Sequence, residues 1–364
     1  MGSDCLIQQF ATGIRQETGD VFMDNRIISR LNPTMGRRTL LGLLAISAGT
    51  ALVGCSNAGK GASAQEGDKG TDALSICASF YPMYDFTQKV GGDRVDVTCL
   101  VPAGTEPHDW EPSTSDIRAI SETDVLVYSG AGMEHWVSDV LDGISNDKLV
   151  TVEASDGVKL RELSAEAQAE EAEEHAHEGH DHDHGHGEDA SATDPHVWLA
   201  PLNAKTQLGN IRDALVKADP DGKETYDANF EKWAAELETL DSEFSNGLTD
   251  LPNKTIVVSH EAFGYLCDAY GLTQMPIEGI EADSEPDAQQ MAKIVEFVQA
   301  NNVKTIFSEE LVSPKVAQAI ADASGASVEE LNPLEGLSDE ELAAGEDYLS
   351  VMRSNLDALK KALS

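Results

Sequence analysis

Short apolar runs alternate with amphipathic stretches over residues 73–200. The apolar runs predict four strands, in LSICA, VDVTCLVPAG, VLVYSGAG and KLVTVEAS. Two stretches between them predict helices: MYDFTQKVGG, after a turn at Tyr81-Pro82, and SDIRAISETD. Alternation of strands and helices is typical of a parallel sheet that is covered on both faces.

The same alternation returns in residues 251–364. TIVVSH and VKTIFSEE predict strands, ASVEELNPLEG predicts a strand followed by a loop, and LTQMPIEGI is either a strand or a loop. The predicted helices are EAFGYLCDAYG, DAQQMAKIVEFVQANN, PKVAQAIADASG and EDYLSVMRSNLDALKKAL. A second α/β lobe is therefore expected in this part of the chain.

Residues 201–250 carry a helical pattern without a strand signal, broken once at Asp219-Pro220. Apolar side chains recur three or four positions apart on one face, as expected of an amphipathic helix. They are Tyr226, Phe230, Trp233, Leu237, Leu240 and Phe244. The predicted architecture is thus two α/β lobes that flank a helical spine. Ligands of such sheets bind beyond the carboxyl ends of the strands.

The pattern of residues 35–54 is that of a bacterial lipoprotein signal peptide. Arg37 and Arg38 precede an apolar run that is too short for a comfortable transmembrane helix and that ends in LVGC. In signals of this kind, cleavage leaves the cysteine, here Cys55, as a lipid-carrying N-terminus. The protein is therefore expected to be exported and anchored by lipid to the outer face of the bacterial cytoplasmic membrane.

The segments on either side of this signal are predicted to lie outside the lobes. Residues 55–72 are rich in Gly, Ser, Ala and Lys, a composition typical of a flexible tether. Residues 1–34 show no clear periodicity, and we interpret them as an upstream extension, with Met35 the better start.

Acidic residues dominate the charged positions: 65 Asp and Glu against 25 Lys and Arg give a formal net charge of −40. This charge argues against a nucleic-acid partner, whose phosphates require a basic surface. It also argues against electrostatic attachment to anionic lipid. An acidic surface would concentrate cations near the protein, although it could equally serve solubility alone.

Histidines and carboxylates are concentrated in residues 162–194, which contain twelve acids and no Lys or Arg. The histidines of this segment are His175, His177, His180, His182, His184 and His186. A segment with so few apolar residues cannot build a core, whereas its neutral imidazoles suit zinc, copper, nickel or iron. We predict an acidic His-rich loop that holds several metal ions weakly.

Three further histidines follow predicted strands or the acidic loop. His108 comes after VDVTCLVPAGTEP, His196 lies in DPHVWLAP, and His260 follows TIVVS directly. An oxygen donor is expected in LNPLEGLS, with Glu335 favoured over Asn332. Three imidazoles and one carboxylate can form a closed site for a divalent transition metal. Two of these ligands would come from each lobe, so the metal would bridge the cleft.

The motifs PAGTEPHDWEPSTSD, DPHVWLAP, SHEAFGYL and SPKVAQAIADASGASVEELNPLEGLS together resemble the ZnuA/AdcA-type zinc-binding proteins of bacterial ABC importers, within solute-binding protein family 9. The resemblance covers about residues 73–364. It implies two lobes joined by a long rigid helix, and Zn²⁺ held by His108, His196, His260 and Glu335. Ala200 departs from the family pattern, in which Asp is common at this position, and little effect on ligation is expected.

The resemblance also implies how the protein works. It would be a monomeric, non-enzymatic protein that captures Zn²⁺ and delivers it to a cognate permease powered by a separate ATPase, with its lipid as the only membrane attachment. Manganese-type relatives tend to place a carboxylate where His260 stands. Two readings from other classes remain open: a zinc-dependent hydrolase, and a surface metal buffer or adhesin that uses mainly the acidic loop.

Several other side chains leave alternatives open. His135 could be a gate or transient ligand near the cleft, or an ordinary loop histidine. Glu261 could act as a general base in a hydrolase, or simply begin a helix. Cys77 and Cys99 could form a disulfide in an exported protein or remain two buried thiols.

Overall fold

The computed structural model describes residues 73–163, 193–280 and 286–364, all within one compact unit of the chain, residues 66–364. The predicted upstream extension, signal peptide and tether lie outside the described residues. So does most of the acidic loop, residues 164–192. Among the residues that the structure describes, no helix combines the length and the apolar character needed to cross a membrane.

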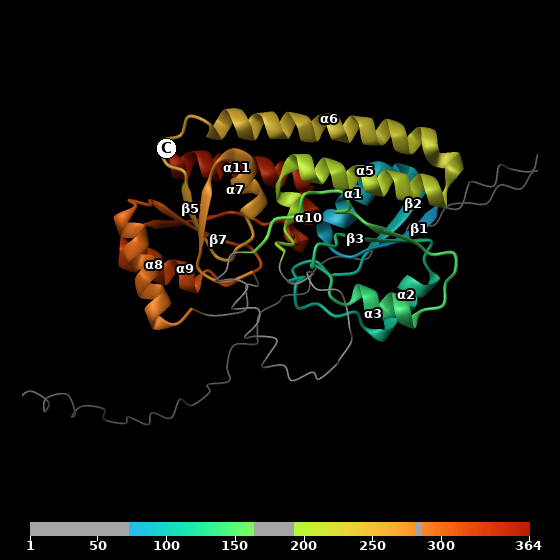
Figure 1. Ribbon diagram of the computed structural model, residues 1–364, viewed down its shortest axis with the longest axis horizontal. Helices are drawn as coiled ribbons and strands as arrows, with labels where there is room; N and C mark the ends of the chain where they lie inside the picture. Colours follow the sequence, from blue (N-terminus) through green and yellow to red (C-terminus); the bar gives the residue numbers. More distant parts are fainter. Residues whose placement is uncertain (1–72, 164–192, 281–285) are drawn as a thin grey trace, which may run out of the picture. The chain divides into compact units, whose positions relative to one another are not determined.

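The first lobe contains a parallel sheet in the order β2-β1-β3-β4 (Figure 1). Its elements are β1 (Leu74–Ala78), α1 (Tyr81–Gly91), η1 (Gly92–Arg94), β2 (Val95–Cys99), α2 (Thr114–Glu122), β3 (Val125–Tyr128), α3 (Val137–Gly143) and β4 (Val150–Glu153). Alternate residues of β1 face opposite layers: Ile76 packs in the core on the side of α1, and Cys77 packs on the side of α2 and α3.

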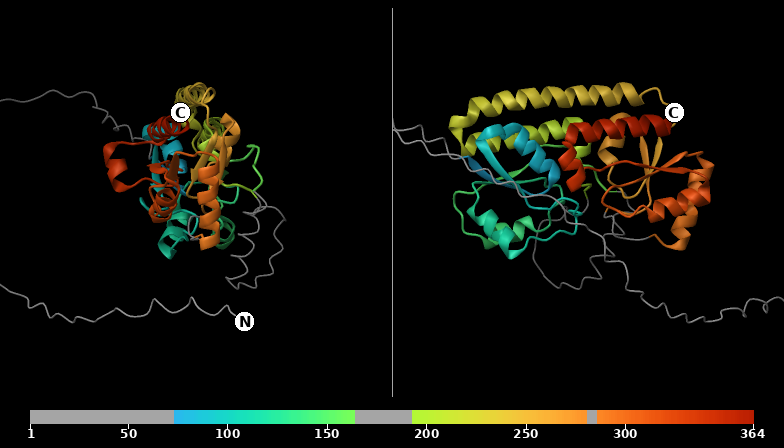
Figure 2. Two further views of the ribbon diagram at one scale, coloured as in Figure 1. Left: turned by 90° about the vertical axis from the view of Figure 1, so that its left-hand side faces the viewer. Right: turned by 180° about the vertical axis from the view of Figure 1, so that it is seen from behind.

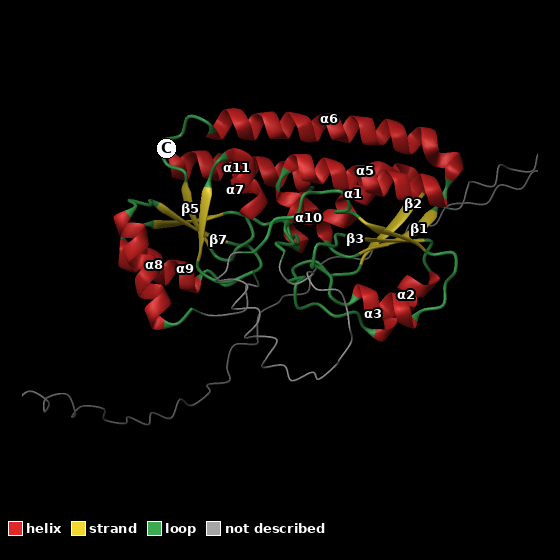
Figure 3. Ribbon diagram, viewed as in Figure 1, coloured by secondary structure: helices red, strands yellow, loops and turns green. Residues whose placement is uncertain are grey.

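The second lobe repeats this topology, with a parallel sheet in the order β6-β5-β7-β8 (Figure 3). Its elements are β5 (Thr255–Val258), α7 (Gly264–Tyr270), β6 (Thr273–Pro276), α8 (Ala288–Ala300), β7 (Thr305–Ser308), α9 (Lys315–Ser324), β8 (Ser327–Glu330), α10 (Asp339–Ala344) and α11 (Tyr348–Leu363). Both predicted α/β lobes are therefore present, each with helices flanking a parallel sheet.

The region predicted as a spine consists of two helices. After η3 (Val197–Leu199), α5 (Pro201–Ala218) packs on α1 and the first sheet, and η4 (Pro220–Gly222) separates it from α6 (Lys223–Leu248) at the predicted break. The 26 residues of α6 correspond to a length of about 39 Å. Figure 2 shows α6 running along one side of both lobes, where it contacts α1 and α5 as well as α7 and α11.

A single hydrophobic cluster continues from the first lobe through α6 into the second lobe. It includes Phe80 between β1 and α1, Leu240 on α6, and Val258 and Tyr348 in the second lobe, each almost fully buried. Across the boundary, the rings of Phe86 and Tyr348 meet edge to face, with their centroids 5.0 Å apart. The lobes thus share one core rather than a solvated hinge.

Local chemistry explains where several helices begin. Capping boxes start α2 at Ser113, α8 at Asp287, α10 at Ser338 and α11 at Asp347, each satisfying backbone N–H groups that the first turn leaves free. The predicted turn at Tyr81-Pro82 is wrong: α1 begins at Tyr81, since a proline is compatible with the first helical turn.

Helix α7 is shorter than predicted and begins at Gly264 rather than Glu261. The preceding residues make a tight turn instead, in which the Ala262 N–H donates to the His260 carbonyl (2.9 Å) and the Glu261 N–H donates to the Gly279 carbonyl (2.7 Å). Glu261 therefore does not begin a helix. The short helices α3 and α10 were not expected from the pattern, because neither is long enough to show a clear period.

Cys77 and Cys99 are free thiols on neighbouring strands. In the parallel register, Cys77 pairs with Thr98 and Ala78 pairs with Cys99. Residues paired in this way point to the same face and successive residues to opposite faces, so the two thiols lie on opposite sides of the sheet. The register thus favours two reduced thiols over the disulfide.

Candidate metal centre

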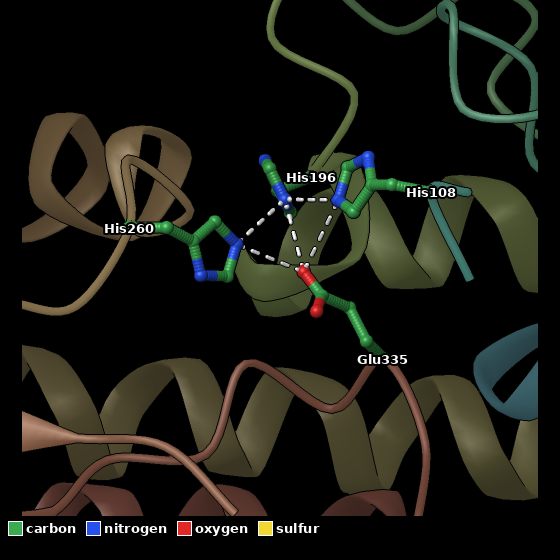
Figure 4. Close-up of side chains that lie close together, drawn as sticks. All are labelled: His108, His196, His260 and Glu335. Carbon is green, nitrogen blue, oxygen red and sulfur yellow. Dashed lines mark hydrogen bonds and ion pairs between the residues drawn. The ribbon is translucent and has the colours of Figure 1, made fainter. Parts of the chain in front are cut away.

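The structure brings together the four residues singled out as primary metal ligands. One ligand atom from each of His108, His196, His260 and Glu335 lies within 4.8 Å of the others (Figure 4). His108 lies in the loop after β2, and His196 directly precedes η3. His260 is the second residue after β5, and Glu335 lies between β8 and α10. Two residues thus come from each side of α6 in the sequence.

Five of the six separations between the four ligand atoms are close to those of a tetrahedral zinc site. The Nε2 atom of His196 lies 3.2 Å from Nε2 of His108, 3.3 Å from Nε2 of His260 and 3.0 Å from Oε1 of Glu335. The same Glu335 oxygen lies 3.1 Å from Nε2 of His260 and 3.5 Å from Nε2 of His108. Ligands 2.0–2.1 Å from a central ion would form a regular tetrahedron with edges of about 3.3–3.4 Å. The observed distances match this size closely.

Carboxylates behind two of the histidines orient the rings. Oδ1 of Asp194 lies 2.9 Å from Nδ1 of His196, and Oε2 of Glu309 lies 2.7 Å from Nδ1 of His260. A carboxylate accepts the Nδ1 proton, which leaves the Nε2 lone pair facing the other ligand atoms. Lone pairs and a carboxylate oxygen that converge at such distances repel each other unless a cation or a proton lies between them.

The site is shielded from water. His196 and His260 are 0% exposed, Glu335 2% and His108 8%. Burial lowers the pKa of His260, but the adjacent carboxylates of Glu309 and Glu335 outweigh it and hold this pKa well above its ordinary value. Burial raises the pKa of Glu335, but the imidazole of His260 and hydrogen bonds from the histidines bring it well below its usual value. Protons and metal ions therefore compete for the same atoms.

The second lobe presents its ligand where the strand order reverses. The strand after β5 in sequence, β6, lies on one side of β5, and β7 lies on the other. His260 follows β5, and its partner Glu309 follows β7 directly. Crevices at such switch points are the usual binding sites of open α/β sheets.

Asn332, the less favoured candidate for the oxygen ligand, instead stabilises the loop that carries Glu335. Its side-chain oxygen accepts from the Leu334 N–H (2.7 Å), and its amide nitrogen donates to Oε2 of Glu310 (3.0 Å). These contacts hold Leu334 in a left-handed conformation, with φ of 60°, just before Glu335. Because β-carbon crowding disfavours this conformation, the loop needs such support to present Glu335.

The remaining candidate residues lie elsewhere. His135 is exposed and is not part of the four-residue group. Oε1 of Glu261 lies 3.8 Å from Nη1 of Arg161. Cys55 and the histidines of the acidic loop, from His175 to His186, lie outside the described residues.

Sequence reasoning missed the two orienting carboxylates, Asp194 and Glu309. Asp194 stands two residues before His196, and this short spacing lets its carboxylate accept from both the backbone N–H (3.0 Å) and Nδ1 of that histidine. The DPH motif could have revealed it. Glu309 is 49 residues from His260, so only its place after an apolar strand offered a signal.

Comparison with known proteins relates almost the whole described region to one family. Residues 76–362 match the model of the ZnuA family, described as "Zinc-uptake complex component A periplasmic". The chain is 43% identical over 324 residues to the high-affinity zinc uptake system protein ZnuA of Bacillus subtilis strain 168, covering 88% of this chain and 97% of that protein.

A longer relative matches over part of its length, and a solved zinc-bound structure shares the fold of this chain. The chain is 40% identical to the zinc-binding protein AdcA of Streptococcus pyogenes serotype M6. This match covers 79% of this chain and 55% of AdcA, which is the longer protein. The crystal structure of the Zn(II)-bound ZnuA-like domain of Streptococcus pneumoniae AdcA superposes with a TM-score of 0.67 at 36% identity, covering 80% of this chain and 99% of that domain. The chain belongs to the ZnuA family of zinc-uptake components.

Proposed function

We propose that this protein captures Zn²⁺ outside the cytoplasm and delivers it to the permease of an ABC importer, with His108, His196, His260 and Glu335 as its four zinc ligands. The observation that carries the proposal is the buried group of four ligand atoms, in which five of the six separations have the length expected around zinc. Its relatives named for zinc uptake and zinc binding support the same cargo.

The donor set favours zinc over manganese. Three imidazoles and one carboxylate suit zinc, whereas harder ions such as manganese prefer oxygen ligands. His260 carries much of this preference, because a carboxylate in its place would leave an evenly mixed set of nitrogen and oxygen donors. Copper(II) would bind the same donors more tightly, so metal supply must decide between copper and zinc in the cell.

A transport role fits the site better than hydrolysis does. Catalytic zinc sites use three protein ligands and keep one position open for water or substrate. Here Glu335 would occupy the fourth position, and all four side chains are buried. Glu261, the possible general base, lies beside the guanidinium of Arg161. We therefore propose that the protein is not an enzyme.

Delivery requires the two pairs of ligands to separate. His108 and His196 belong to the first lobe, and His260 and Glu335 belong to the second. Moving one pair away from the other would leave two ligands on each side and weaken the hold on the ion. We propose that a permease, driven by a separate ATPase, promotes this separation, and that the protein acts as a monomer.

Metal analysis of the purified protein tests the proposal. Protein loaded with zinc and dialysed should keep one tightly bound zinc per chain, with zinc identified by elemental analysis. Excess manganese should not displace it. Hydrolysis of ester, peptide or phosphate substrates by the loaded protein, or a single site occupied by manganese, would contradict the proposal.

Deleting residues 170–189 is expected to remove several weak zinc sites and leave the tight one. None of the six histidines of this segment is among the four proposed ligands, and free imidazoles bind metal only when neutral. In the intact protein, the weak sites should therefore fade as pH falls below about 6.5. Calorimetric titration of both proteins measures the number of sites. Loss of the tight site together with the weak ones would show that the loop supplies an essential ligand or that the loop is the main metal store.

Replacing Cys55 with alanine is expected to release the protein from the membrane into the medium of a Gram-positive host. The reason is that LVGC ends a signal-like apolar run, so that this cysteine would carry the lipid anchor. Cell fractionation measures the release, and Cys77→Ala is the matched control, because that thiol lies in β1. Mass spectrometry that finds residues 35–54 still attached to the mature protein would contradict the lipid anchor.

A further inference from the structure

Arg161 lies where the two lobes meet, among three carboxylates. Its Nη1 atom lies 3.3 Å from Oδ2 of Asp194, and its Nε atom lies 3.3 Å from Oδ2 of Asp268. The third carboxylate, Glu261, lies 3.8 Å from Nη1. Asp194 belongs to the first lobe, whereas Glu261 and Asp268 belong to the second. The guanidinium thus bridges the lobes, and we call these four residues the Arg161 cluster.

The backbone and both carboxylate oxygens of Asp194 make polar contacts. Its backbone N–H donates to the Arg161 carbonyl (2.9 Å), and its own carbonyl accepts from the hydroxyl of Tyr265 (3.0 Å). One carboxylate oxygen faces Arg161, and the other accepts from the backbone and ring of His196. Since Asp194 is 0% exposed, Arg161 supplies the positive charge that accompanies this buried carboxylate.

The cluster reaches a ligand in each lobe. Asp194 orients His196 directly, and Glu261 is the neighbour of His260 in the chain. Packing beside the cluster is close: a β-carbon at Gly264 would lie 2.4 Å from Oδ2 of Asp194 and 2.7 Å from Nη1 of Arg161. The two chain segments that lead into and out of the acidic loop also meet here, through an antiparallel bridge between Glu162 and Thr193.

We propose that Arg161 is a positioning residue for zinc capture, which fixes Asp194, and through it His196, against the second lobe. This inference rests on the proposed function. Arg161 does not touch the metal position. It keeps the ring of His196 aimed at the other ligands and joins the two lobes at the edge of the site, so that its loss should speed the escape of bound zinc.

The test compares the full-length protein with Arg161→Met. We expect zinc affinity, measured by chelator competition, to fall by at most the factor of about 10–100 that is usual when a partner in direct contact with a ligand is lost. Arg161 contacts that partner, Asp194, and not the ligand itself. Most of the change should appear as faster dissociation in stopped-flow release. With Co²⁺ in place of zinc, the visible absorption bands should also change, because the ring of His196 is no longer fixed. A merely structural role would leave this spectrum unaltered.

Arg353→Met is the matched control, since Arg353 on α11 also contacts two carboxylates, Glu243 at 2.9 Å and Glu236 at 3.7 Å, but both lie on α6 and outside the metal centre. It should bind zinc and cobalt like the wild type. Arg161→Lys keeps the positive charge but not the forked shape of the guanidinium, so its zinc affinity should be intermediate. If Arg161→Met fails to fold, the affinity of Arg161→Lys is the decisive measurement.

The outcomes separate the two proposals. If the wild type holds no tight zinc, the proposed function fails. If the wild type holds zinc and the Arg161 variants match it in affinity, dissociation rate and cobalt spectrum, the positioning role of Arg161 is overturned.

Discussion

Replacing His260 with alanine is expected to abolish tight zinc binding while the protein stays folded. The substitution removes one of four ligands and leaves the buried carboxylate of Glu309 without the ring that it contacts at 2.7 Å. Loss of a partner behind a ligand costs about 10–100-fold in affinity, so loss of the ligand itself should cost more than about 100-fold. Chelator competition on the purified variant measures the change.

His135→Ala is the matched control for this substitution. His135 is exposed and lies outside the four-residue group, so its removal should leave the tight site intact. Circular dichroism of both variants checks that they are folded. If His260→Ala binds zinc as tightly as the wild type does, the ligand assignment is wrong.

Replacing Trp198 with alanine is expected to lower the free energy of unfolding by about 3–5 kcal/mol, the usual cost of deleting a buried aromatic side chain. Trp198 is 0% exposed and packs edge to face on Phe80, with the ring centroids 4.9 Å apart. Its indole N–H donates to the Pro333 carbonyl (2.8 Å), two residues before Glu335. The variant should therefore also bind zinc more weakly. Denaturant unfolding of metal-free protein measures the stability.

Trp233→Ala is the comparison for this effect. Trp233 lies on α6, is only partly buried, and has the ammonium groups of Lys89 and Lys232 within 5 Å of its ring, at 4.8 and 4.3 Å. Its loss should cost clearly less stability than that of Trp198. Equal losses for both variants would show that Trp198 has no special place in the core.

The parts of the fold that the sequence predicted are those with a strong local signal. In the first sheet, β1 and β3 are short and mostly apolar, and β2 and β4 alternate apolar with polar residues. The amphipathic face of α6 has a clear helical period. His108, His196 and His260 could be grouped because strand ends in parallel sheets gather at one edge. Glu335 was favoured over Asn332 from its place in the loop after a predicted strand, and the family resemblance implied the same residue.

The parts that could not be predicted depend on contacts between distant residues or on backbone conformation. The pairing of His260 with Glu309 crosses 49 residues and becomes visible only once β5 and β7 lie side by side. Glu335 was already favoured over Asn332, but no hydrophobic pattern reveals the left-handed conformation of Leu334, the residue before it. Likewise, the sequence suggested that Glu261 begins a helix. The turn that it forms instead depends on a hydrogen bond to the distant carbonyl of Gly279, which the local sequence does not show.

The shared core of the two lobes limits how such a protein can evolve by recombination. Their matching strand orders make the lobes resemble interchangeable modules. However, Phe86 on α1 packs against Tyr348 on α11, and one cluster of buried side chains continues through both lobes. In a chimera that takes one lobe from a relative, the core side chains of the two lobes would no longer be matched in volume. Mismatched volumes in a packed core are destabilising. Diversification should therefore proceed by substitutions at the metal centre and in surface loops, with the lobes inherited together.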